Sequence, residues 1–206
     1  MSKVKLAIVY YSSTGVNYQL AQWAAEGGKQ ADADVKLLRV EEIASPALIE
    51  ANPKWKAHLE ATREIPIATS DDIVAADAII FSTPTRFGNI AAQMKMFLDT
   101  MGKIWFSGQT VNKVVSAMTS ASNVHGGQET TVVSLYTTMY HWGAVVVAPG
   151  YTDQSLYAAG GNPYGVSVST DELEKKAKEV RAAVQHQAKR VVAIAEALKR
   201  GLRSDW

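Results

Sequence analysis

The sequence predicts an α/β fold with a doubly wound, five-stranded parallel sheet and helices on both faces. Short apolar segments rich in β-branched residues alternate along the chain with longer segments of helical periodicity, which is typical of βαβ units with right-handed crossovers. Most of these apolar segments are continuous, as expected for strands that are covered on both faces. A chain of 206 residues can close one sizeable core but is short for two. We therefore expect one domain over residues 1–206.

Four of the expected strands are strongly apolar, and a fifth is weaker. The strong segments cover residues 4–11, 78–82, 114–119 and 144–148. Residues 34–40 carry Val35, Leu37 and Val40 between charged side chains, so we place this strand nearer an edge of the sheet.

Helical patterns occupy the segments between these strands. Residues 17–30 place apolar side chains on one face and include Gly27 and Gly28, which we interpret as the terminator. Thr69 and Asp72 form a capping-box pattern that opens a short helix through residue 76. Further helices are expected over residues 89–101 and 130–142. The clearest pattern runs from residue 173 to residue 198, with apolar residues at spacings of three and four.

Two long segments do not fit the alternation. Residues 41–68 contain three prolines, and residues 149–169 are rich in glycine, tyrosine and proline. Loops of this length inside a compact domain are usually functional or interfacial. They carry the aromatic residues Trp55, Tyr151, Tyr157 and Tyr164, which we expect to be exposed and available to an interface.

Composition excludes several classes of function. Twenty-one basic residues balance twenty acidic ones, so no bulk charge favours nucleic acid or anionic lipid. With no cysteine, any redox chemistry requires a bound cofactor. The histidines are too scattered to predict a metal site, and no Gly-x-Ser-x-Gly elbow of a hydrolase occurs. Neither a signal peptide nor a membrane-spanning stretch is evident, so we expect a cytoplasmic protein.

The loop after the first strand predicts a phosphate site. It contains Ser12, Ser13, Thr14, Gly15, Val16 and Asn17 and leads directly into a helix. Hydroxyl groups, backbone amides and a helix N-terminus favour an anion. The loop lacks both the lysine of a nucleoside-triphosphate loop and the Gly-x-Gly-x-x-Gly pattern of a dinucleotide fold, so a monophosphate remains. The alternative is simple helix capping, for which one hydroxyl would suffice.

Two further loops should meet the first at the carboxyl edge of the sheet. The second contains Thr83, Pro84, Thr85, Arg86, Phe87, Gly88 and Asn89, and the third contains Thr119, Ser120, Ala121, Ser122, Asn123, Val124, His125, Gly126 and Gly127. Pro84 and Gly88 favour a tight turn that brings backbone groups against a flat heterocycle. Arg86 either supplies positive charge there or is simply exposed. The third loop is small and polar, which suits hydrogen bonds to a ring or a sugar chain.

Several of these motifs occur together in one known family. They are Tyr10-Tyr11-Ser12 with Gly15, Pro84-Thr85-Arg86-Phe87-Gly88-Asn89, Phe97-Leu98-Asp99, Trp105, Gly126-Gly127-Gln128-Glu129, Gly150-Tyr151 and Pro163-Tyr164-Gly165. With these motifs the chain resembles the WrbA-type NAD(P)H:quinone oxidoreductases over most of its length. Thr14 and Val16 stand where that family commonly carries an aromatic residue and a histidine.

The resemblance implies a flavodoxin-like fold with an insertion at about residues 41–68, FMN as cofactor, a homotetramer, and two-electron reduction of quinones by NADH or NADPH. It implies FMN contacts at Ser12, Ser13, Thr14, Gly15, Val16, Asn17, Thr85, Arg86, Phe87, Thr119, Ser120, Ala121, Ser122, Asn123 and His141. Trp105 would match the tryptophan that faces the flavin and its substrates. His141 on its own would equally suit a helix end.

We expect ping-pong turnover without a catalytic nucleophile, in which Arg86 and loop amides stabilise the anionic reduced ring. Two other functions fit the same fold. One is a one-electron carrier of the flavodoxin type, which the neutral composition disfavours because such carriers usually dock through an acidic face. The other is a regulatory protein that binds FMN without turnover.

Overall fold

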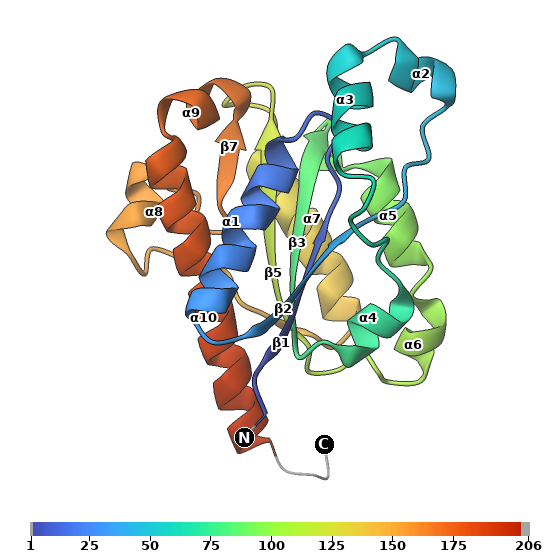
Figure 1. Ribbon diagram of the computed structural model, residues 1–206. Helices are drawn as coiled ribbons and strands as arrows, with labels where there is room; N and C mark the ends of the chain where they lie inside the picture. The colour runs from blue at the N-terminus through green and yellow to red at the C-terminus, as the bar shows by residue number, and fades with distance from the viewer. Residues whose placement is uncertain (1, 203–206) are drawn as a thin grey trace.

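A parallel sheet forms the centre of the computed structural model, which describes residues 2–202 (Figure 1). Its strands are β1 (Lys5–Tyr10), β2 (Asp34–Arg39), β3 (Ala78–Arg86), β5 (Val114–Ala121) and β6 (Val145–Val146), in the spatial order β2-β1-β3-β5-β6. All of these neighbours pair in parallel. The predicted doubly wound sheet is therefore confirmed, and the weaker strand lies at its edge as expected.

Helices cover both faces of the sheet. One layer contains α1 (Val16–Gln30) and α10 (Ala177–Gly201), and the other contains α4 (Ser70–Ala75), α5 (Ala92–Asp99), α6 (Gly102–Phe106) and α7 (Gln128–His141). In β1, Leu6 and Ile8 pack against the first layer, whereas Ala7 and Val9 pack against the second. Burial on both faces explains why this strand is continuously apolar.

The fifth position of the sheet is divided between two strands. β6 pairs with the beginning of β5, and β7 (Ser167–Ser169) pairs with its end. Between them the chain leaves the sheet and forms α8 (Gln154–Ala158). The strand expected at residues 144–148 is therefore only two residues long, and the second long segment is an excursion from the sheet.

Two side chains replace the strand pairing that the division removes. Gln187 of α10 donates from Nε2 to Ala117 O and Ser116 Oγ, and its Oε1 accepts from Val166 N–H. On the other face, the Tyr136 hydroxyl accepts from Ala117 N–H and donates to Tyr164 O. Burial raises the pKa of Tyr136 to about 12, so the hydroxyl keeps the proton that it donates.

The segment expected as an insertion contains α2 (Pro46–Glu50) and α3 (Pro53–Ala61). The sequence suggested loops because of its prolines, but Pro46 and Pro53 occupy the first turns of these helices, where proline needs no hydrogen-bond donor. Ser45 and Asn52 cap them through side-chain oxygens. In Figure 1 both helices lie at the end of the sheet to which the strands point.

Gly27 and Gly28 do not end α1, which continues to Gln30. A Cβ atom on Gly27 would lie 2.7 Å from the backbone of Gln185 in α10, and one on Gly28 would lie 2.6 Å from Leu6. These glycines therefore allow α1 to approach α10 and the sheet closely. The helix-terminator interpretation was wrong because Gly27 packs against Gln185, which lies far along the chain in α10.

Other boundaries also differ from expectation. α4 has the predicted capping box of Thr69 and Asp72. α5 begins only at Ala92, because the first two residues of the expected helix form β4 (Asn89–Ile90), antiparallel to β3. The last helical pattern is divided at Lys176 into α9 (Thr170–Lys175) and α10. Within residues 2–202, no helix has both the length and the apolar character needed to cross a bilayer.

Candidate functional site

The three polar loops meet around one hollow at the carboxyl edge of the sheet. Its lining residues are Ser12, Ser13, Thr14, Val16, Asn17, Pro84, Thr85, Arg86, Ser120, Ala121, Ser122 and Thr170. The hollow measures about 80 Å³, well below the several hundred cubic ångströms typical of whole-ligand pockets. It can therefore accommodate a phosphate group, whereas a larger ligand would extend beyond it along the loops.

Arg86 supplies positive charge at this hollow. Its Nη2 donates to Ser13 Oγ at 3.1 Å and its Nη1 donates to Thr85 O at 3.1 Å, so the guanidinium joins the second loop to the first. Within the described part of the chain, Arg86 forms no ion pair, and no carboxylate lines the hollow. The charge is therefore available to an anionic ligand.

Asn17 fixes the first loop to the ends of two strands. Its Nδ2 donates to Ser120 Oγ at 2.7 Å, and Ser82 Oγ donates to Asn17 Oδ1 at 3.2 Å. The side chain is almost fully buried. These contacts use both ends of the amide, so Asn17 positions the loops around the hollow.

The second and third loops touch one another. Thr85 Oγ1 donates to Gly126 O at 3.2 Å, and a Cβ atom on Gly127 would lie 2.6 Å from Gly88 Cα. Phe87 and Gly88 both have positive φ values, 52° and 77°, at the tip of the hairpin of β3 and β4. Such a conformation is unusual for a bulky residue and often occurs at ligand sites. Phe87 is fully exposed there.

Several residues named from the sequence do not line the hollow. Gly15 is the left-handed N-cap of α1. Thr119 is buried and donates to Thr83 O, whereas Asn123 accepts from His125 N–H within the third loop. His141 and Trp105 lie elsewhere: they line a separate hollow of about 380 Å³ between α5, α6 and α7, where Trp105 Nε1 donates to His141 O at 2.7 Å.

Two residues near the first loop were missed by the sequence analysis. Thr170, at the start of α9, lines the hollow, and the Ser-x-x-Glu capping pattern of Ser169 and Glu172 could have indicated this helix start. The ring of His58 in α3 lies 5.6 Å from the ring of Tyr18, tilted by 51°, and its Nδ1 would lie 3.6 Å from a Cβ atom on Gly15. Burial lowers the pKa of His58. No local signal predicts this contact between α3 and the first loop.

Glu42 joins the inserted segment to the beginning of the first loop. Its Oε2 accepts from Tyr11 Oη at 3.0 Å and Trp55 Nε1 at 2.9 Å, and its Oε1 accepts from Gln93 Nε2 at 2.8 Å and Ala44 N–H at 2.9 Å. Burial and this carboxylate raise the pKa of Tyr11, which keeps the hydroxyl a donor. Trp55 is therefore half-buried, contrary to the expectation that it is exposed.

Replacing Glu42 with glutamine is expected to destabilise the protein by about 1–3 kcal/mol, because an amide cannot accept all four hydrogen bonds. FMN affinity should fall with it, since Tyr11 directly precedes Ser12. Thermal unfolding and flavin titration measure the two effects. Glu41→Gln, at an exposed neighbouring position, is the control. An unchanged melting temperature for Glu42→Gln would contradict this role.

The site fits the phosphate of FMN. Hydroxyl groups, an uncompensated guanidinium and the N-terminus of the 15-residue helix α1 converge on one small hollow, and each of these groups stabilises a phosphate dianion. The contact between Gly88 and Gly127 holds the second and third loops together. Among the described residues, no group of three or more metal-ligating side chains occurs.

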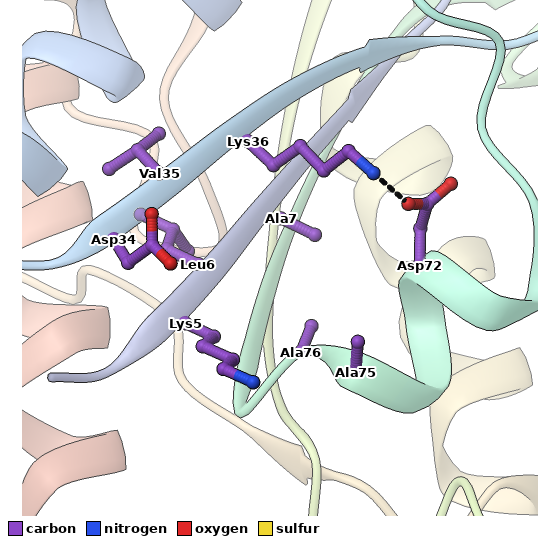
Figure 2. Close-up of a pocket in the computed structure, with 9 residues that line it drawn as sticks. All are labelled: Lys5, Leu6, Ala7, Asp34, Val35, Lys36, Asp72, Ala75 and Ala76. Atoms are coloured by element: carbon purple, nitrogen blue, oxygen red, sulfur yellow. Dashed lines mark hydrogen bonds and ion pairs between the residues drawn. The ribbon is translucent and has the colours of Figure 1, made fainter. Parts of the chain in front are cut away.

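Another hollow, of about 290 Å³, lies at the amino ends of β1 and β2, away from the three loops (Figure 2). Ala7, Ala75 and Ala76 contribute only methyl groups there, and Lys36 reaches across to pair with Asp72 of α4. This hollow lies at the amino ends of the strands, whereas ligands of a parallel sheet bind at the carboxyl edge.

Comparisons with known proteins agree with this geometry. Residues 4–154 match the family model described as NADPH-dependent FMN reductase. Two relatives named NAD(P)H dehydrogenase (quinone) are similar: one from Deinococcus radiodurans is 52% identical, covering 92% of this chain and 94% of the relative, and one from Trichlorobacter lovleyi is 44% identical, covering 79% and 82%.

Solved structures show the same fold. A flavodoxin described as a WrbA-like protein from Agrobacterium tumefaciens has a TM-score of 0.66 at 23% identity and covers 95% of this chain and 99% of its own. The two-electron reduced flavodoxin of Megasphaera elsdenii has a TM-score of 0.54 at 18% identity, covering 89% and 98%. The chain therefore belongs to the NADPH-dependent FMN reductase family and has a flavodoxin-like fold.

Proposed function

We propose that this protein is an FMN-dependent oxidoreductase that transfers two electrons from NADH or NADPH to quinones. The observation that carries the proposal is the phosphate-sized hollow built by three strand-end loops with an uncompensated Arg86. The names of the close relatives support the same reaction. We propose FMN contacts at the residues that line this hollow and at the adjoining Phe87 and Gly88.

Bound FMN would supply the hydride-accepting and electron-donating chemistry. The chain's own part is to bind and orient the cofactor and to stabilise negative charge. Arg86, held by Ser13 and Thr85 O, places a fixed positive charge at the loops, and preorganised charge of this kind stabilises an anionic reduced ring. We propose that nicotinamide and quinone use one open face in turn, which is a ping-pong sequence.

The proposal is tested by releasing the cofactor and by assaying turnover. Denaturation followed by chromatography is expected to yield FMN and no FAD, because the hollow offers one phosphate site. Steady-state oxidation of NADH or NADPH with benzoquinone is expected to show parallel initial-velocity lines. FMN binding without turnover would favour a regulatory protein, and one-electron exchange alone would favour a carrier. FAD as the main species would refute the cofactor assignment.

We further propose a homotetramer in which a neighbouring subunit completes each flavin site. α7 extends for 14 residues, about 20 Å, from Gln128 beside the third loop to His141 at its far end. His141 and Trp105 therefore cannot reach the hollow of their own chain, and the contact implied by the family resemblance requires another copy. Phe106 and Tyr140, the chain neighbours of Trp105 and His141, are largely exposed, as aromatic interface residues are before assembly.

Trp105→Ala is expected to leave FMN bound but to lower quinone turnover per flavin, because it removes an aromatic surface that would face a planar substrate. Flavin content and kcat/KM measure this difference.

Wild-type activity should fall on dilution as subunits dissociate, which sedimentation and parallel assays can follow. A monomer with undiminished activity would refute the shared site. The single domain, the insertion near residues 41–68 and the cytoplasmic location stay predictions.

A further inference from the structure

A further hollow, of about 340 Å³ and distinct from those described above, adjoins the cofactor site. It is lined by Val124, Gln128, Glu129, Tyr151, Gly160, Gly161, Asn162, Pro163, Tyr164, Ser167 and Glu172. Ser122 and Thr170 line the phosphate hollow, and Val124 and Glu172 line this one. The third loop and the beginning of α9 thus border both hollows. The volume of the 340 Å³ hollow is in the range of small-molecule sites.

Three side chains that line this hollow carry hydrogen-bond acceptors without a partner among the described residues. Gln128 is only 5% exposed and donates from Nε2 to Asn123 O, but its Oε1 is buried and accepts no hydrogen bond from the described residues. Within residues 2–202, Glu129 accepts none either, and Glu172 uses only Oε2, for Ser169. A buried acceptor without a donor is costly. The hollow therefore suits a ligand that brings several donors.

The other lining groups narrow the chemistry of that ligand. Tyr151 and Tyr164 present partly exposed aromatic rings, and Tyr151 stacks on Tyr157 at 4.9 Å, so a planar group can pack there. No lysine, arginine or histidine lines the hollow. A phosphate would meet two carboxylates without a compensating cation, whereas a sugar with adjacent hydroxyl groups and an amino-substituted heterocycle would supply the missing donors.

We propose that this hollow binds the adenosine half of NADH, with Glu129 and Glu172 accepting from the ribose hydroxyls. Carboxylates hydrogen-bond a free 2′-hydroxyl and repel a 2′-phosphate, so the protein selects NADH over NADPH. This selection differs from the cofactor named in the description of its family. The inference rests on the proposed function, because it assigns one end of the dinucleotide that would reduce the flavin.

The first test compares the two dinucleotides with Glu129→Gln in the FMN-loaded protein. We expect wild type to have the lower KM for NADH. The variant should raise KM for NADH about tenfold, the loss expected for one hydrogen bond to a charged acceptor, with little change in kcat. Glu129→Lys should in addition lower KM for NADPH. Glu174→Gln, exposed on α9 outside the hollow, is the matched control. A wild-type preference for NADPH, or unchanged KM values in both Glu129 variants, would overturn the proposal.

The second test measures binding without turnover. Calorimetric titration of the FMN-loaded protein with ADP-ribose is expected to show an affinity that falls about tenfold in Glu129→Gln and is retained in Glu174→Gln. 2′-Phospho-ADP-ribose should bind more weakly to wild type. Equal binding of both ligands would exclude recognition by the carboxylates. If neither dinucleotide is oxidised with benzoquinone, the proposed function fails, and this titration still decides separately whether the hollow binds the adenosine group.

Discussion

Replacing Gln187 with leucine is expected to lower the free energy of unfolding by about 3 kcal/mol. The amide is 1% exposed and bonds with Ser116, Ala117 O and Val166 N–H at the division between β6 and β7. Leucine fills a similar volume but leaves these buried groups unpaired, and each unpaired group costs about 1–3 kcal/mol. The divided strand can relax partly, so we expect the total loss of stability to lie near the lower end of the summed costs of the unpaired groups.

Urea denaturation measures this effect as a lower midpoint at an unchanged slope. Gln185→Leu, one half-turn earlier on the same helix, is the control: its Nε2 donates to Glu26 near the surface, so its loss should cost less than about 1 kcal/mol. If both variants lose equal stability, the divided strand does not depend on Gln187.

Replacing Ser12 and Thr14 together with alanine is expected to weaken FMN affinity by about 1–3 kcal/mol, or roughly tenfold to a hundredfold in Kd. Both residues line the phosphate hollow. Ser12 Oγ also accepts from Gly15 N–H at 3.0 Å and so holds the turn that precedes α1. The double variant therefore removes hydroxyl groups available to the phosphate and loosens the amides beside them.

Riboflavin, which lacks the phosphate, provides the discriminating measurement. Fluorescence titration of the apoprotein should show a large loss for FMN and almost none for riboflavin. Thr130→Ala, an exposed hydroxyl on α7, should change neither. Equal losses for both flavins would show that the substitutions distort the whole site, and unchanged FMN affinity would show that backbone amides and Arg86 suffice.

The sequence by itself determined the sheet, the helical layers and the three loops at the carboxyl edge. These features follow from local patterns, because a strand buried on both faces must be apolar throughout and a helix that covers it must be apolar along one side. The hydroxyl-rich residues Ser12, Ser13 and Thr14 before a helix likewise indicated an anion site, and the hollow forms around them. The motifs that carried the family resemblance are also local.

Only the tertiary structure decided features that depend on residues far apart in the chain. The sequence suggested that Gly27 ends a helix, whereas in the structure it allows close packing against α10. The apolar pattern of residues 144–148 did not predict that Gln187 replaces part of a strand. Glu42 with its four donors, and Gln128 with its unpaired oxygen, are ordinary polar residues in the sequence. Their roles arise because burial removes water, so each polar group must find its partner across the fold.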